Sequence, residues 1–186
     1  MAHLEQGRQH LDRGELQPAL QEFQAVTGLE PSSAEGHFLL GYTYFQLGEL
    51  EQARTEFLET LQLDPENPDA RANLGAVWYE QAQFEQAEAE FREALSLRPD
   101  DAELHFNLGA TLVQQLKLNL AVAEFTEALR LEPTLAVAYF GLGNARKLQG
   151  HRQEAIEALE QYLELDDSDA KLRPHAQALL EELVGS

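Results

Sequence analysis

Few side chains in this 186-residue sequence have the types and spacing that catalysis or metal binding requires. The six histidines are scattered, and His3 and His10 lie two helical turns apart, which is too loose for a convincing pair of zinc ligands. His37 and His105 fall at equivalent places in a helical packing pattern, so we expect a structural role for both. No Ser/His/Asp arrangement and no catalytic carboxylate pair can be argued from the order of residues. The sequence therefore predicts neither an enzyme nor a metal site.

Two short motifs have the composition of ligand-binding loops but the wrong context. Gly141-Leu142-Gly143 hints at a nucleotide loop, yet it lies inside a helical pattern with no strand before it. The segment 166–169, Asp-Asp-Ser-Asp, lacks the glycine and the final glutamate of a calcium loop and is better interpreted as a helix N-cap. The chain has no cysteine, which excludes disulfides and thiolate metal ligands. We expect no cofactor.

The excess of acidic over basic residues limits the classes of partner that we expect for this chain. There are 33 acidic and 13 basic residues, and the formal net charge is −20. This field repels phosphate backbones and favours encounter with basic proteins, so we expect no nucleic acid partner. The same acidity also serves to keep an elongated surface soluble, which is the simpler interpretation.

No stretch approaches the roughly 20 consecutive apolar residues of a membrane span, so we expect no membrane insertion. The N-terminus lacks the basic region and apolar run of a signal peptide, and we predict a cytoplasmic location. The pattern described next already runs at Met1, as it would in a segment of a longer protein.

Internal repetition is the main signal of this sequence. Five sets of residues recur every 34 positions: Pro31, Pro65, Pro99 and Pro133; Gly7, Gly41, Gly75, Gly109 and Gly143; Ala19, Ala53, Ala87, Ala121 and Ala155; Phe23, Phe57, Phe91 and Phe125, with Leu159 in the fifth place; and Leu40, Leu74, Leu108 and Leu142. Glycine and alanine allow two helices to approach closely, and we expect the phenylalanine to fill the space beside them. Such a period is typical of repeat proteins.

Each repeat is predicted to form two helices. In the second repeat, apolar residues have helical spacing over 34–47 and again over 50–63, with Gly48 between the two runs. Ser32 with Glu35 three positions later has the pattern of a capping box. Asn67 before a first-turn proline, and Asp101, are two further predicted N-caps.

These residues closely resemble the tetratricopeptide-repeat (TPR) signature. The resemblance is carried in the second and third repeats by Gly41, Tyr44, Ala53, Phe57, Thr60, Pro65, Leu74, Gly75, Trp78, Ala87, Phe91, Ala94 and Pro99. It covers essentially the whole chain and implies an all-α fold, a right-handed superhelical α-solenoid of antiparallel helix pairs. We predict a single TPR domain over 1–186, with repeats 1–33, 34–67, 68–101, 102–135 and 136–169 and a capping helix over 170–186. The fifth repeat departs most, with Arg146 in the aromatic slot, as terminal repeats commonly do.

The resemblance also implies a site. The first helix of each repeat would line a concave groove, and helical spacing places there Phe38, Leu39, Tyr42, Asn73, Tyr79, Phe106, Asn107, Phe140 and Asn144. Asn73 and Asn107 share one slot, and TPR proteins use asparagine there to hold a peptide backbone, since its amide both donates and accepts hydrogen bonds. The aromatic rings would receive apolar side chains of a peptide or an amphipathic helix. Alternatively, the rings pack between repeats and the asparagines bond within the chain.

The charges in the groove disfavour a more specific TPR function. Some TPR domains clamp a carboxylate at the C-terminus of heat-shock chaperones with lysine and arginine beside their asparagines. Aligning that arrangement with repeats two to four matches Asn73 but puts Phe38 and Glu103 where cations are required. We therefore predict a scaffold for a different protein partner, one that is basic or amphipathic.

The turn inside the fourth repeat provides a second interpretation. Leu116 stands where the other repeats have Gly14, Gly48, Ala82 and Gly150, and Leu120 is a further surplus leucine. Exposed leucines at a turn indicate a contact site, although local repacking would explain them equally well. The alternative function is thus a self-assembling or architectural module that joins through its end repeats or through the Leu116 turn.

Overall fold

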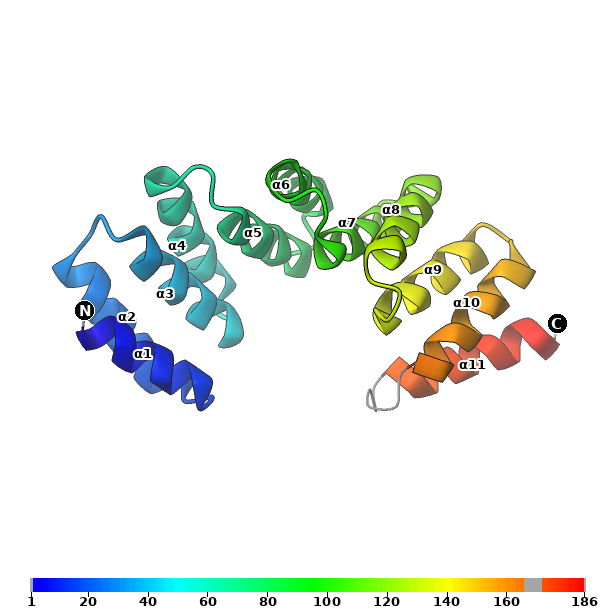
Figure 1. The fold of residues 1–186 in the computed structure, drawn as a ribbon, viewed down its shortest axis with the longest axis horizontal. Helices are drawn as coiled ribbons and strands as arrows, with labels where there is room; N and C mark the ends of the chain where they lie inside the picture. The colour runs from blue at the N-terminus through cyan, green and yellow to red at the C-terminus, as the bar shows by residue number, and fades with distance from the viewer. Residues whose placement is uncertain (1, 166–171, 186) are drawn as a thin grey trace. The chain divides into compact units, whose positions relative to one another are not determined.

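The computed structural model describes residues 2–165 and 172–185, and within them it contains eleven α-helices and no β-strand (Figure 1). The helices are α1 (Ala2–Asp12), α2 (Leu16–Leu29), α3 (Ala34–Gln46), α4 (Leu50–Leu63), α5 (Pro68–Glu80), α6 (Phe84–Leu97), α7 (Ala102–Gln114), α8 (Leu118–Leu131), α9 (Ala136–Leu148), α10 (Arg152–Leu165) and α11 (Leu172–Gly185). The predicted all-α class is confirmed. Two helices lie within each predicted repeat, and α11 lies within the segment predicted to cap them.

The chain forms two compact units, Met1–Leu97 with α1–α6 and Arg98–Ser186 with α7–α11. In the first unit the pairs α1–α2, α3–α4 and α5–α6 pack together, and successive pairs meet through α2–α3 and α4–α5. In the second unit the pairs are α7–α8 and α9–α10, joined through α8–α9, and α11 packs on α10. First helices of successive pairs also touch, α3 with α5 and α7 with α9. Each unit is therefore built from contacts between helices close in sequence, as in other repeat proteins.

The two helices of a pair approach closely where a glycine of the first faces a large side chain of the second. A β-carbon at Gly75 would lie 2.8 Å from Cε1 of Phe91, and one at Gly143 would lie 2.9 Å from Cγ of Leu159. Phe91 is 2% exposed, and neither Leu159 nor Ala87 is exposed at all. There is no room for a β-carbon at these glycines without displacing the facing side chain, which confirms the role predicted for the recurring glycines and alanines.

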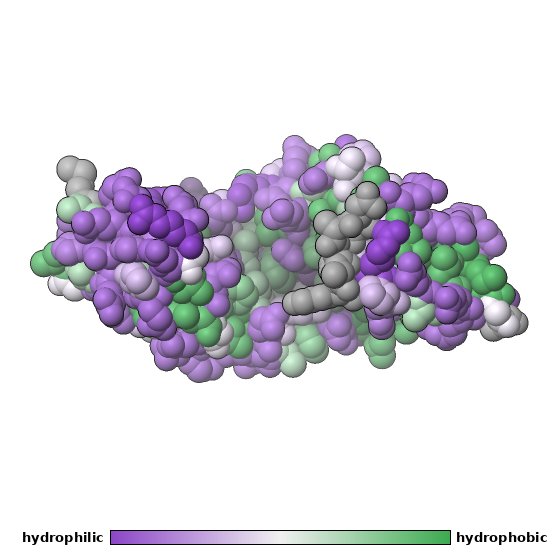
Figure 2. Space-filling view, turned by 90° about the horizontal axis from the view of Figure 1, so that it is seen from below, coloured by the Kyte–Doolittle hydropathy of each residue, from purple (hydrophilic) through white to green (hydrophobic). Residues whose placement is uncertain are grey.

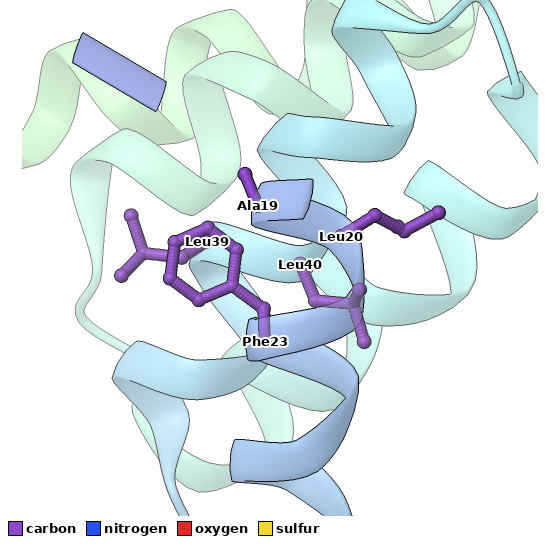
Figure 3. Close-up of a cluster of buried hydrophobic side chains, with 5 residues drawn as sticks. All are labelled: Ala19, Leu20, Phe23, Leu39 and Leu40. Atoms are coloured by element: carbon purple, nitrogen blue, oxygen red, sulfur yellow. The ribbon is translucent and has the colours of Figure 1, made fainter. Parts of the chain in front are cut away.

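Successive pairs are joined by a different set of apolar contacts. In the first unit, Ala19, Leu20 and Phe23 of α2 meet Leu39 and Leu40 of α3 in one buried cluster (Figure 3). The five side chains are between 0% and 9% exposed. This cluster closes the interface between the first and second pairs.

Side-chain caps fix where several first helices begin. The side-chain oxygen of Asn67 accepts a hydrogen bond from the backbone nitrogen of Ala70 at 2.9 Å, and that of Asp101 accepts one from Leu104 at 3.0 Å, as predicted. The prediction for Ser32 is wrong by one residue, because α3 begins at Ala34 and the residue directly before it is the N-cap. The side chain of Ser33 accepts from Gly36. The predicted cap at 166–169 lies outside the described residues.

A polar contact, which we call the inter-helix tie, joins the two helices of several pairs. Nδ1 of His37 lies 2.7 Å from a carboxylate oxygen of Glu56, and its Nε2 lies 3.0 Å from the carbonyl oxygen of Pro31. The same pattern recurs at Arg71 with Glu90 and Pro65, and at His105 with Glu124 and Pro99. Burial raises the pKa of Glu90, although the Arg71 guanidinium acts to lower it. His37 and His105 therefore serve helix packing, as predicted.

Every described turn between the two helices of a pair has one residue at positive φ. These are Gly14 (72°), Gly48 (76°), Ala82 (56°), Leu116 (57°) and Gly150 (79°). At the end of α7, the backbone nitrogens of Leu116 and Lys117 donate to the carbonyls of Val113 and Leu112, both at 2.9 Å. A residue with a β-carbon loses about 1–2 kcal/mol in the left-handed region. Leu116 is therefore strained where three other turns have glycine.

Replacing Leu116 by glycine should raise the free energy of unfolding by about 0.5–1 kcal/mol, because relief of backbone strain exceeds the entropy that glycine adds to the unfolded chain. Denaturant unfolding of the parent and the Leu116→Gly variant measures this difference. Ala82→Gly, in the equivalent turn, is the matched control and should also stabilise the chain. A loss of stability in both variants would show that neither turn is strained.

Candidate functional site

Two residues predicted to line the groove, Phe38 and Tyr42, lie on α3. We call this partly exposed pair the aromatic strip. They lie one helical turn apart and are both half-buried. The ring centroid of Phe38 is 6.0 Å from that of Phe57, and Tyr42 packs against the buried cluster that contains Phe57, Leu74 and Val77. One side of the strip thus belongs to the core, and part of each ring stays accessible to a ligand.

The prediction for Leu39 is corrected. This residue is 7% exposed and packs with the buried cluster of α2 and α3 shown in Figure 3. It occupies the slot that holds Asn73 in the next repeat. An apolar side chain in that slot gains free energy by joining its buried neighbours, whereas an amide does not. Leu39 therefore offers little surface to a partner.

The other predicted residues of the first unit lie on α5, which touches α3. Asn73 is half-buried, and its Nδ2 donates a hydrogen bond to the carbonyl oxygen of Asp69 at 2.8 Å. This bond uses one of the two amide donors, and among the described residues the amide oxygen has no partner. Tyr79 packs edge-on against Phe84, with ring centroids 5.5 Å apart. Asn73 thus keeps hydrogen-bonding capacity on a helix that touches the one bearing the aromatic strip.

In the second unit, Phe106 and Asn107 lie next to each other on α7. Both are half-buried, and the ring centroid of Phe106 is 5.9 Å from that of Phe125. The backbone carbonyl of Asn107 accepts a hydrogen bond from the Thr111 hydroxyl at 2.7 Å. Phe106 repeats, against Phe125, the packing that Phe38 makes against Phe57.

The last two predicted residues lie on α9, part of which α11 covers. The ring of Phe140 lies 5.5 Å from that of Tyr162 and 5.7 Å from that of His175 in α11. One turn beyond the half-buried Asn144, Nζ of Lys147 donates to a carboxylate oxygen of Glu182 at 2.7 Å. Helix α11 therefore takes up part of the surface that Phe140 and Lys147 would otherwise present.

The structure brings Phe38, Tyr42 and Asn73 onto touching helices of the first unit, and Phe106, Asn107, Phe140 and Asn144 onto touching helices of the second. Asn73 and Asn107 thus belong to different units. Phe38, Tyr42, Phe106 and Phe140 pack against buried neighbours and are themselves only half-buried.

The turn of the fourth repeat is exposed. Leu116 is 73% exposed and Leu120 is 49% exposed. Beside them, the side-chain oxygen of Asn119 accepts a hydrogen bond from Nε2 of Gln149, at 2.8 Å, which ties this turn to the next one. Burial does not account for the two leucines, so local repacking does not explain them.

Within residues 2–165 and 172–185, no three histidine or acidic side chains lie where they could hold a metal ion. No helix there is both long enough and apolar enough to span a membrane. Figure 2 shows one face of the molecule, where hydrophilic surface predominates and hydrophobic side chains gather in smaller patches.

Comparison with known families agrees with this architecture. A model described as TPR repeat matches residues 7–48, 41–81 and 77–116, and a second, described as tetratricopeptide repeat, matches 136–169. The chain belongs to the tetratricopeptide-repeat family. The second match coincides with the predicted fifth repeat. No curated protein matches the TPR chain.

Solved TPR structures share its fold at low sequence identity. PilF from Pseudomonas aeruginosa is 23% identical with a TM-score of 0.85, and the match covers 99% of this chain and 82% of that one. MamA from Desulfovibrio magneticus RS-1 is 22% identical with a TM-score of 0.83, covering 91% and 96%. YrrB, described as a TPR protein with an unusual peptide-binding site, is 24% identical with a TM-score of 0.77, covering 95% and 90%. These likenesses establish an α-solenoid of helix pairs.

Two contributions to the TPR surface were not predicted from the sequence. One is the set of glutamates that complete the inter-helix ties, Glu22, Glu56, Glu90 and Glu124, which recur every 34 residues. In the first pair, a carboxylate oxygen of Glu22 lies 2.6 Å from Nδ1 of His3. The other is the cover that α11 provides over Phe140, which no sequence pattern indicates, since it depends on how α11 packs.

The contribution of the aromatic residues to packing is testable on α7. Phe106→Ala should lower the free energy of unfolding by about 2–3 kcal/mol, somewhat less than for a fully buried phenylalanine. Asn107→Ala, at the adjacent position, should change it by no more than about 0.5 kcal/mol. Denaturant unfolding monitored by circular dichroism measures both. If the two substitutions cost the same, the contact between Phe106 and Phe125 does not stabilise the unit.

Proposed function

We propose that this TPR chain is a non-enzymatic scaffold that binds a peptide or an amphipathic helix on the first helices of its repeats. The observation that carries the proposal is the pairing, on the touching helices α3 and α5, of the aromatic strip with the partly unsatisfied amide of Asn73. A partly exposed aromatic surface beside an amide suits a peptide, because the rings receive apolar side chains while the amide bonds to the backbone.

The second unit provides a similar but smaller surface. Phe106 and Asn107 offer the same ring and amide on α7, and Asn144 adds a further amide on α9. The chain's charge of −20 favours a basic partner through faster encounter. The description of YrrB as having a peptide-binding site supports the same class of ligand for this chain.

Substituting the asparagines tests the backbone contacts. One hydrogen bond between uncharged groups contributes about 0.5–1.5 kcal/mol, so Asn73→Ala and Asn107→Ala should each weaken peptide binding by about that amount. The double variant should lose about 1–3 kcal/mol if the two effects add. Affinity capture from the native lysate provides a partner, and titration calorimetry with its peptide measures the affinity.

Gln62→Ala, which removes an exposed amide from the second helix α4, is the matched control and should bind like the parent. Raising the salt concentration should slow association with a basic peptide in every variant, because it screens the charge of the chain. Equal affinity for the parent and the double asparagine variant would remove the asparagines from the mechanism.

A second candidate function, self-association, is favoured by one observation. Leu116 is 73% exposed and is held at a positive φ where three of the other turns have glycine. An apolar side chain that is both strained and exposed is a reason to expect a contact there. If Leu116 joins copies of the chain, light scattering across a concentration range should show a molecular mass that rises for the parent and stays monomeric for Leu116→Gly. A concentration-independent monomer mass for the parent would exclude this function.

A further inference from the structure

The inter-helix tie is missing from the fifth repeat. Tyr139 stands where His105 and Arg71 stand in earlier repeats, and Ala158 stands in the position of the partner glutamate. Ala158 is 5% exposed and lies between α9 and α10, where the longer glutamate side chain lies in the earlier repeats. Losing both partners removes the polar bridge and leaves space that a glutamate would occupy.

A cavity of about 270 Å³ lies at this place, between α8, α9 and α10 of the second unit. Its lining includes Tyr139, Leu142 and Ala158. Leu142 belongs to the recurring leucines, and its counterparts Leu74 and Leu108 are 0% and 2% exposed, whereas Leu142 is half-buried. The cavity therefore exposes an apolar wall that the other repeats keep covered.

The charged residues at the rim of the cavity carry a net negative charge. Nε of Arg146 lies 2.9 Å from a carboxylate oxygen of Glu154, so these two charges largely compensate each other. Glu157, also in the lining, accepts a hydrogen bond from Nε2 of Gln153 at 3.0 Å. Glu157 has no cationic partner among the described residues. One carboxylate is thus left over at the mouth of an apolar cavity, on a chain that is already strongly acidic.

We infer that this cavity, which we call the repeat-five pocket, binds a lysine or arginine side chain of a partner protein. The apolar stem of such a side chain would lie along Leu142, and its charged end would reach the carboxylate of Glu157. Arginine is favoured over lysine, because a guanidinium also stacks on the ring of Tyr139. The charge of the whole chain draws the same kind of partner towards this site.

The repeat-five pocket is separate from the proposed peptide site. Successive residues of a helix are rotated by about 100°, so Tyr139, Leu142 and Arg146 share one side of α9, whereas Phe140 and Asn144 lie on the opposite side. Binding in the pocket and binding on the first helices can therefore succeed or fail independently.

The probe is N-acetyl-arginine amide, titrated into the full ¹⁵N-labelled chain and followed by NMR, with the uncharged citrulline analogue as the comparison ligand. Binding of one side chain should be weak, with a dissociation constant of about 1–10 mM. The amide shifts should centre on Tyr139, Leu142 and Glu157 and not on Phe140 or Asn144. Shifts of equal size with the citrulline analogue, or shifts confined to Phe140 and Asn144, would overturn the inference.

Matched variants separate the pocket from general acidity. Glu157→Gln should weaken arginine binding by about threefold, as expected for the loss of one partly exposed charge pair, whereas Glu160→Gln removes an equal charge from the same helix and should have no effect. Equal weakening in both variants would mean that only the overall charge attracts the probe.

The double variant Tyr139→His/Ala158→Glu rebuilds the inter-helix tie and should close the pocket. It adds a carboxylate, yet arginine binding should be lost while the helical circular dichroism spectrum is retained. Binding that stays equal or becomes tighter in this folded variant would show that the cavity does not hold the side chain.

Discussion

The close approach of two helices at a glycine is the constraint on which the rest of this chain depends. Each pair needs a residue without a side chain on one helix, as at Gly75, and a large apolar side chain on the other, as at Phe91. This contact sets how near the helices lie, and so it decides which side chains are left on the outside. This contact therefore sets the spacing of the helices that carry the aromatic strip, the inter-helix ties and the repeat-five pocket.

Much of the fold could be predicted from the sequence because its determinants are local and repeated. The glycine, alanine and phenylalanine ladders, and the caps at Asn67 and Asp101, act over a few residues or within one helix pair. The error at Ser32 has the same local character, since two adjacent serines could each cap α3 and the backbone geometry selected Ser33. Because the same pattern recurs in five repeats, an error of one residue at the start of one helix does not change the predicted fold.

The candidate site was less predictable, because exposure depends on neighbours that periodicity does not specify. Helical spacing put Leu39 and Tyr42 on the same face, but Leu39 joined the cluster with α2 while Tyr42 kept an accessible part. Phe140 lies on α9, the first helix of its pair, yet α11 packs against it. The repeat-five pocket arises because Tyr139 and Ala158 replace the two partners of the inter-helix tie. Their effect could be recognised only after the structure showed that the glutamates of the other repeats are partners in the ties.

The inter-helix ties join residues only 19 positions apart, and helices within each unit pack mainly on their neighbours in sequence. A chain with such local contacts has a low contact order, and proteins of this kind fold in microseconds to milliseconds. Little loop entropy must be lost before the first pair is stabilised, so folding can begin at any pair and spread to the next. Opening should be graded as well, with exchange of backbone amide hydrogens fastest in the terminal helices and slowest at the centre of each unit.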